Sequence, residues 1–197
     1  MQDKASPPRF EPLSDGTIAL RALEPEDVEV TVAWRNDPEI RDRVLSFRFP
    51  VSHVMELDFI KRAIAGEGTN QCVAGIVDLS DGALVGLVYL KDIDWISRHA
   101  AFGMMIGRRD RQGRGFGRRA LHLMLRHAFN VLNLERVYLF VADYNAPALK
   151  LYETSGFRHE GTLRRHVALG GHYHDLLVMG LLRSEFADFP AEGESSR

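Results

Sequence analysis

The feature that most constrains this chain is a glycine-rich turn that joins an apolar segment to an amphipathic helix. The turn reads Gln-Gly-Arg-Gly-Phe-Gly at residues 112–117, and the apolar segment before it runs from Phe102 to Ile106. Beyond the turn, apolar side chains recur on one helical face, at Ala120, Leu121, Met124, Leu125, Ala128 and Phe129. This succession predicts an α/β fold in which a helix covers one face of a sheet.

The same turn has the properties of an anion-binding site. The first turn of a helix presents unpaired backbone N–H groups and the positive end of the helix dipole, and both attract phosphate. Positive side chains are dense there, as Arg108, Arg109, Arg111, Arg114, Arg118 and Arg119. The spacing of Gly113, Gly115 and Gly117 matches neither the dinucleotide fingerprint nor the phosphate-loop pattern. The local residues therefore fit a diphosphate-binding loop and an ordinary basic helix cap equally well.

The rest of the chain predicts a sheet of about seven strands with helices on its faces. Apolar runs mark strands at residues 17–21, 71–78, 84–91, 99–106, 136–142, 157–162 and 173–182. Helical spacing and capping residues mark further helices at 24–36, 53–65 and 145–154. Residues 39–50 are expected to be irregular. The run Arg136 to Ala142 is apolar on both faces, which places it in the middle of the sheet.

Length and composition indicate one ordinary globular domain. We expect a flexible segment at residues 1–16, a single domain at 17–186 and a disordered tail at 187–197. The formal net charge of −2 argues against a general nucleic-acid or anionic-membrane binder. The chain has no run of the roughly 20 apolar residues that span a bilayer and no apolar core of a signal peptide at its start. A cytoplasmic protein is expected.

Metal and disulfide chemistry are not expected. The single cysteine, Cys72, can form neither an internal disulfide nor a cysteine-based metal site. His172 and His174 alternate on one strand face, but two ligands without a third partner make a weak metal site. A solvated or hydrogen-bonded histidine pair is the simpler interpretation.

A second motif follows the central strand. Residues 145–157 read Asn-Ala-Pro-Ala-Leu-Lys-Leu-Tyr-Glu-Thr-Ser-Gly-Phe, and they predict a short helix with Asn145 at its N-cap. The Asn145 amide can hold either the helix end or a ligand. Tyr152 lies on the helical face that it shares with Ala148 and Leu151, where a tyrosine is by default an amphipathic core residue. Its hydroxyl gains a chemical role only if it reaches the cleft of the glycine turn.

Together, the two motifs and their order resemble the GNAT superfamily of N-acetyltransferases, and in particular its RimJ/RimL-type branch. That branch's opening resembles Leu20 to Asp27 and Trp34 to Pro38, and its ending resembles Gly171 to Asp175 with Met179 to Leu182. The similarity covers about residues 17–186. It implies a mixed, largely antiparallel sheet that splays open beside the glycine turn.

The resemblance assigns the glycine turn to acetyl-CoA, whose pyrophosphate the family binds through backbone amides. Met105 and Ile106 match positions whose backbone groups pair with the pantetheine arm, and Asn145 matches an asparagine near the reactive end. The implied cofactor-binding residues are Met105, Ile106, Gln112, Gly113, Arg114, Gly115, Phe116, Gly117, Arg118 and Asn145. Side chains in place of the three glycines would block the phosphates from the amides. No metal is implied.

The resemblance also implies a catalytic pair, Tyr152 and Asn145. Tyr152 matches the tyrosine that commonly protonates the departing CoA thiolate, which it can do only within hydrogen-bond reach of the sulfur. Many relatives place a glutamate early in the strand before the turn, and the matching position here is Ala101. The departure puts a direct carboxylate base in doubt. A water chain, another carboxylate or a histidine could take the proton of the amine.

The acceptor stays open at this stage. A protein N-terminal α-amine, a polyamine, an amino sugar and another small amine all fit, and no nucleic-acid or membrane partner is expected. Relatives often pair, which suggests a homodimer. Ala101 also leaves room for a different class of function, a non-catalytic acyl-CoA-binding or regulatory module of the same fold.

Overall fold

The computed structural model describes residues 13–45, 49–65 and 70–187. Its sheet has eight strands in the order β1-β2-β3-β4-β5-β6-β8-β7. The strands are β1 (Leu13–Ser14), β2 (Ile18–Arg21), β3 (Cys72–Asp78), β4 (Leu84–Asp94), β5 (His99–Ile106), β6 (Arg136–Ala142), β7 (Arg158–Leu169) and β8 (His172–Leu182). The helices are α1 (Val28–Asn36), α2 (Pro38–Arg41), α3 (His53–Ala65), α4 (Phe116–Arg126) and α5 (Ala146–Thr154).

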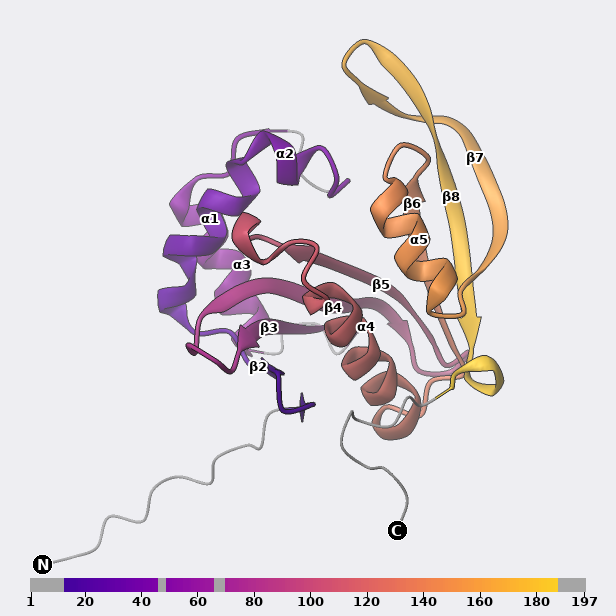
Figure 1. Cartoon of the computed structure of the whole chain (residues 1–197), viewed down its shortest axis with the longest axis horizontal. Helices are drawn as coiled ribbons and strands as arrows, with labels where there is room; N and C mark the ends of the chain where they lie inside the picture. The colour runs from indigo at the N-terminus through magenta and orange to yellow at the C-terminus, as the bar shows by residue number, and fades with distance from the viewer. Residues whose placement is uncertain (1–12, 46–48, 66–69, 188–197) are drawn as a thin grey trace, which may run out of the picture.

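Helices cover both faces of this sheet, as predicted (Figure 1). Successive residues of a strand point to opposite faces, and on β4 Val88 belongs to one apolar cluster while Leu87 belongs to the other. The Val88 cluster contains the buried side chains of α4 together with Tyr152 of α5. The Leu87 cluster contains Trp34 of α1 and Ile60 of α3. The central strands are therefore buried on both sides.

The sheet is antiparallel except where β5 meets β6. These two strands are parallel and pair over three positions, His99↔Arg136, Ala100↔Val137 and Ala101↔Tyr138. Beyond them, β5 continues to Ile106 along β4 while β6 continues along β8. The second half of β5 therefore leaves its β6-facing backbone groups without a strand partner. This splay, predicted from the resemblance, creates the space for a site.

Three local features differ from the sequence expectations. The eighth strand, β1, has two residues, too few for a periodic pattern, and it lies within the predicted flexible segment 1–16. Residues 39–50 are not uniformly irregular, because Pro38 and the N-cap Asp37, which accepts a hydrogen bond from the Glu39 N–H, start the short helix α2. Residues 46–48 of this segment lie outside the described residues. The β7–β8 hairpin is longer than predicted and extends past the neighbouring strands (Figure 1).

Candidate functional site

A cavity of about 1190 Å³ opens where β5 and β6 diverge. Its walls come from the second half of β5, the glycine turn, the N-terminal end of α4, and α5. Further lining residues come from α2 and the segment after it, and from β4, β6, β7 and β8. This volume is larger than that of a usual pocket for a drug-sized molecule, so the cavity can hold a long, flexible ligand. The structure thus brings the two sequence motifs to one cavity.

Two glycines of the turn are required by the backbone itself. Gly113 and Gly115 have φ angles of +71° and +87°, a region that side-chain-bearing residues rarely adopt, and Gly115 is the N-cap of α4. A Cβ atom on either would meet no protein atom within 4 Å. Gly117 differs, because its Cβ would lie 3.3 Å from Cε of Met104. Crowding against the protein therefore does not explain Gly113 and Gly115, whereas backbone conformation does.

Not every residue of the turn faces the cavity. Gln112, Gly113, Gly115, Gly117 and Arg118 belong to its lining. The side chain of Phe116 is buried in the core beneath α4, and the Arg114 guanidinium lies 5.9 Å from the Phe116 ring centroid. Neither of those two side chains lines the cavity. Their predicted contribution to the cofactor therefore depends on their backbone amides.

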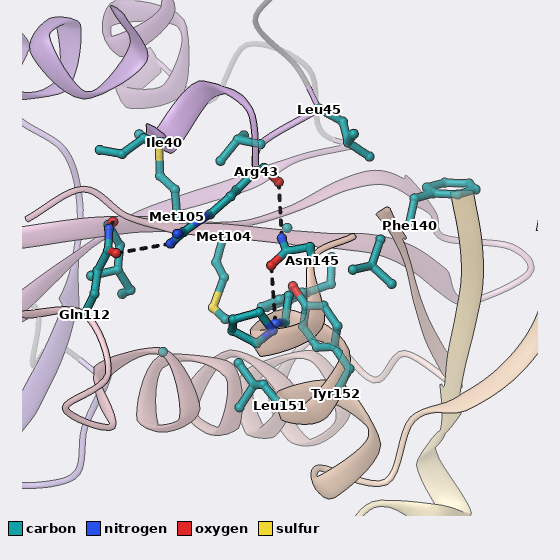
Figure 2. A pocket seen from close by; sticks show the side chains of 18 of the residues that line it. Ile40, Arg43, Leu45, Met104, Met105, Gln112, Phe140, Asn145, Leu151 and Tyr152 are labelled. Atoms are coloured by element: carbon teal, nitrogen blue, oxygen red, sulfur yellow. Dashed lines mark hydrogen bonds between the residues drawn. The ribbon is translucent and has the colours of Figure 1, made fainter. Parts of the chain in front are cut away.

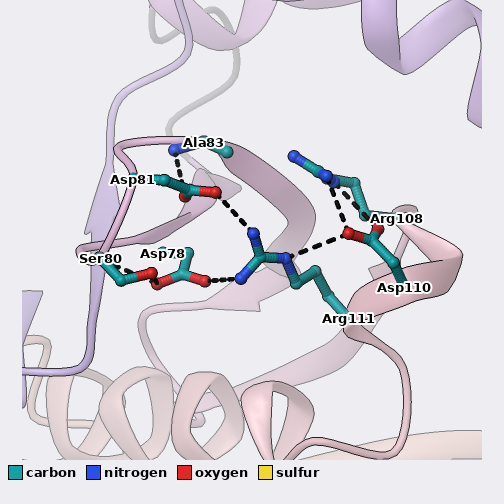
Figure 3. A network of polar contacts seen from close by, with 7 residues as sticks. All are labelled: Asp78, Ser80, Asp81, Ala83, Arg108, Asp110 and Arg111. Carbon is teal, nitrogen blue, oxygen red and sulfur yellow. Dashed lines mark hydrogen bonds and ion pairs between the residues drawn. The ribbon is translucent and has the colours of Figure 1, made fainter.

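The arginines around the turn are mostly paired with the protein's own carboxylates. Arg111, whose side chain is 13% exposed, contacts Asp78 and Asp81 of the β3–β4 hairpin (Figure 3). Other ion pairs are Arg108–Asp110, Arg109–Asp37 and Arg119–Asp15. The local positive charge seen in the sequence is thus largely compensated in the fold. These arginines brace the turn against the elements around it.

Replacing Arg111 by methionine should loosen this brace. The Asp78 carboxylate, 4% exposed, would keep its hydrogen bonds from Ser80 but lose its arginine. We expect the free energy of unfolding to fall by about 1–3 kcal/mol at pH 7 and the dissociation constant of CoA to rise. Chemical denaturation and calorimetric titration measure the two effects. Arg109→Met, which removes an exposed pair with Asp37, is the control and should change the free energy of unfolding little.

The effect of Arg111→Met should depend on pH in a defined direction. Hydrogen bonds from Ser80 and the charge of Arg111 lower the pKa of Asp78. A carboxyl with a lowered pKa contributes stability that is fully present above its ordinary pKa of about 3.9 and is lost as the pH falls through the lowered value. The free energies of unfolding of the wild type and the variant should therefore converge as the pH falls below the lowered pKa of Asp78. A difference that persists there would contradict this assignment.

The free edge of β5 is held by a side chain from the turn. Nε2 of Gln112 donates to the carbonyl oxygen of Ile106 at 3.0 Å, and Oε1 of Gln112 accepts from Arg43 at 3.3 Å (Figure 2). Backbone groups of Ile106 were expected to pair with the pantetheine arm, and its carbonyl already has a partner within the protein. Met105 lines the cavity. It pairs with Leu87 of β4 on one side, and on the other side β6 has already diverged from β5.

Asn145 both caps α5 and lines the cavity. Its Oδ1 accepts from the Ala148 N–H at 3.4 Å, and its Nδ2 donates to the Arg43 carbonyl at 3.5 Å (Figure 2). The two possible roles of this amide, helix cap and ligand contact, are thus compatible in one place. Both bonds are long, so the amide can exchange them for a ligand.

Tyr152 presents its hydroxyl to the cavity while its ring is buried. The residue is 7% exposed and lines the cavity (Figure 2), and its ring packs edge-on against Phe102 with centroids 6.3 Å apart. Burial raises the pKa of Tyr152, and the nearby Tyr89 raises it further. The phenol therefore keeps its proton throughout the neutral range. At neutral pH, Tyr152 can therefore act as a proton donor but not as a base.

The cavity contains no carboxylate among the described residues that line it. Ala101 is 1% exposed in the sheet and does not line the cavity, so the position that the family resemblance matched to a glutamate provides no base here. Asp94 lies outside the lining and accepts hydrogen bonds from the Ile96 and Ser97 N–H groups, as a loop residue does. Of the histidines, His166 reaches the lining. A metal-binding group of three or more ligands is absent from the described residues, and His174 pairs with Asp143.

Several lining residues carry no sequence signal of their own. They come from three parts of the chain: Arg43 follows α2, Tyr89 and Lys91 belong to β4, and His166 belongs to β7. Tyr89 lies over Gly103, whose Cβ would fall 2.3 Å from the tyrosine ring. A glycine inside the β5 pattern was the one available hint, because it indicates close approach of another group.

Comparison with known proteins gives one consistent result. A family model described as an acetyltransferase (GNAT) domain matches residues 17–158. The spermidine N(1)-acetyltransferase of Vibrio cholerae serotype O1 is 38% identical over 169 residues, which cover 86% of this chain and 95% of that protein. The putative ribosomal N-acetyltransferase YdaF of Bacillus subtilis is 28% identical, with 86% and 93% covered.

Solved structures agree with the sequence relatives. The crystal structure of the Vibrio cholerae spermidine N-acetyltransferase in complex with CoA and spermine superposes with a TM-score of 0.78 at 32% identity, covering 86% of this chain and 98% of that one. A dodecameric structure of the same enzyme gives a TM-score of 0.73 at 31% identity, with 86% and 95% covered.

Proposed function

Since the chain belongs to the GNAT acetyltransferase family, and is thus an acyltransferase that uses acetyl-CoA, we propose that it acetylates a primary amine by direct transfer in a ternary complex. The observation that carries this proposal is the meeting of Tyr152 with the glycine turn in one cavity. The two segments are separated in the sequence by α4 and β6. A helix cap alone would not require a buried phenol at the other end of the cavity.

In the proposed binding mode, the turn holds the diphosphate of the cofactor. The N-terminal N–H groups of α4 and the backbone of Gly113 and Gly115 donate to the phosphate oxygens. The edge of β5 from Met104 onward, along which β6 no longer pairs, provides backbone groups for the pantetheine arm, apart from the Ile106 carbonyl that Gln112 already holds. Acetyl-CoA supplies the activated acetyl group as a thioester.

The chain's own groups then serve the transfer. A neutral amine attacks the thioester carbonyl, and backbone N–H groups on the β5 edge stabilise the negative charge on its oxygen. Tyr152 donates its hydroxyl proton to the sulfur as the carbon–sulfur bond breaks, so CoA leaves as a thiol. Asn145, at the N-cap of the same helix, positions the reactive end. The amine proton passes to solvent or to a group such as His166, because Ala101 offers no carboxylate.

The finer assignments are also proposals. The RimJ/RimL-type branch and the homodimer rest on the family resemblance, and the single domain over residues 17–186 and the cytoplasmic location rest on length and composition. The relatives compared above include spermidine acetyltransferases and one assembles as a dodecamer, so sedimentation of the purified protein is the direct test of the dimer. Within the described residues, no helix is long and apolar enough to cross a membrane.

The second candidate function is an acyl-CoA-binding module without turnover, and Ala101 is the observation in its favour. An amine panel with acetyl-CoA separates the two functions through release of free thiol. The panel should contain a peptide N-terminus, spermidine, an amino sugar and amino acids. We expect thiol release with at least one class. CoA binding without release from any of them would favour the module.

The low reactivity expected of Cys72 keeps the protein's own thiol from contributing to the thiol-release signal. Its thiol is partly buried, and burial raises its pKa. The thiolate is the reactive form of cysteine, so Cys72 should react slowly with a disulfide reagent. The colour that develops should therefore report released CoA and not the protein.

A further inference from the structure

A second cavity, of about 440 Å³, adjoins the first on the side of α1 and α3. The two cavities share four lining residues: Val44, Tyr89, Lys91 and Met105. Tyr89 is close enough to Tyr152 to influence its protonation. The shared residues thus mark the junction between the reactive end of the first cavity and the space beyond it.

The walls of the second cavity are mostly apolar, and they include three cations and, among the described residues, one carboxylate. Val73, Leu87, Phe59 and Met105 contribute aliphatic and aromatic surface. Its cations are Arg35, Arg62 and Lys91, and among the described residues its one carboxylate is Glu56. Glu56 is 1% exposed and is ion-paired with Arg35, so its charge is already balanced.

Lys91 is the cation that the fold leaves without a carboxylate at the junction. Within the described part of the chain it forms no ion pair, whereas Arg62 pairs with Asp58. It follows Tyr89 by two residues on β4, so both side chains lie on the same face of the sheet at a spacing of about 7 Å. Across the ladder it pairs with Ala101, which offers no carboxylate to a neighbouring ammonium. The nearest position across the strand pair therefore leaves the charge of Lys91 unbalanced.

We infer that the acceptor is a primary amine that also carries an anionic group, a carboxylate, on an apolar body, and that Lys91 selects it. This inference rests on the proposed function and names its substrate class. The amine points to Tyr152 and the thioester, the apolar body fills the second cavity, and the carboxylate pairs with Lys91. A polyamine would instead place a further ammonium against Lys91, with no unpaired described carboxylate in the walls to receive it.

The positive charge at position 91 should therefore give this protein a different substrate preference from that of an enzyme that acetylates a polycation. Repulsion between Lys91 and a second ammonium of the ligand would oppose the binding of a polycation. Apolar amino acids are the simplest molecules with the required amine, carboxylate and apolar body. They are the probes for the test.

The test compares each amino acid with its own amide. The pairs are leucine with leucinamide and phenylalanine with phenylalaninamide. The two members of each pair have the same amine and side chain, and only the acid has a carboxylate. Spermidine serves as the polycation. We expect kcat/KM, measured by thiol release, to be higher by about tenfold or more for each acid than for its amide and for spermidine. The amine of the amide has the lower pKa and is more often neutral, so amine reactivity alone predicts the opposite order.

Variants at position 91 assign the effect to the lysine. Lys91→Glu should lower kcat/KM for leucine about tenfold or more, raise it for spermidine, and leave KM for acetyl-CoA unchanged. Lys91→Arg should retain the preference for the acids. Lys61→Glu, an exposed charge reversal on α3 outside both cavity linings, is the matched control and should change neither value.

The outcomes are distinct. A wild-type protein that prefers spermidine, or that treats each acid and amide alike, overturns the inference and leaves the acetyltransferase proposal standing. A Lys91→Glu variant with an unchanged ratio of leucine to spermidine turnover also overturns it. Absence of thiol release with every amine would overturn the proposed function and the inference together.

Discussion

Replacing Gly115 by valine is expected to raise the dissociation constant of CoA about 100-fold or more. Gly115 has a φ angle of +87° at the N-cap of α4, where a β-branched residue is a genuine outlier. The valine would strain the turn by about 1–3 kcal/mol. Its side chain would also occupy space that the protein leaves open, since a Cβ there meets no protein atom within 4 Å. Calorimetric titration with CoA measures the loss.

A matched control separates strain from the binding site. Gly171, in the turn between β7 and β8, has a φ of +80°, its Cβ also meets nothing within 4 Å, and it does not line the cavity. Gly171→Val should therefore lower the melting temperature comparably and leave CoA binding unchanged. If Gly115→Val bound CoA as tightly as Gly171→Val, the glycine turn would be an ordinary helix cap and no phosphate cradle.

The glycine turn also shows what the sequence could predict. Its strand-to-helix position and the helical period after it located β5 and α4 correctly, because local spacing and burial specify these elements. The bounds of α3 and β6 were predicted for the same reason. The meeting of the two motifs in one cavity followed from the family resemblance, not from the local residues.

The pairing of the loop arginines could not be predicted. Arg111 meets Asp78 and Arg119 meets Asp15, partners that lie far away along the chain and nearby only in the folded sheet. A row of arginines in a sequence carries no information about which carboxylates will reach it. In the sequence, the positive charge around the turn therefore looked available to a ligand. In the structure, most of it is paired with carboxylates of the protein.

Lys91 illustrates the same limit at the acceptor end. In the sequence it is one lysine in a β-strand pattern, and exposed lysines on strands are common. Its significance comes from three non-local facts: the junction of two cavities, the absence of an ion pair within the described residues, and Ala101 across the ladder. Only the register of β4 on β5 brings these together.

Replacing Tyr152 by phenylalanine is expected to lower kcat by about 10²–10³-fold, with KM for acetyl-CoA changed by less than about twofold. The ring packs edge-on on Phe102 and lies 5.7 Å from Phe157 between centroids, and phenylalanine keeps both contacts. The variant should therefore fold and bind CoA normally. What it lacks is the proton for the leaving sulfur. Thiol release under saturating acetyl-CoA measures kcat directly.

Tyr138→Phe is the control, because Tyr138 is a partly buried tyrosine on β6 that does not line the cavity. It should leave kcat unchanged. The pH profile gives an independent check: burial raises the pKa of Tyr152 above its ordinary value of about 10, so wild-type kcat should not decline through loss of this proton below about pH 10. A Tyr152→Phe variant with wild-type kcat would remove this residue as the acid. The leaving thiolate would then take its proton from water that enters the gap between β5 and β6.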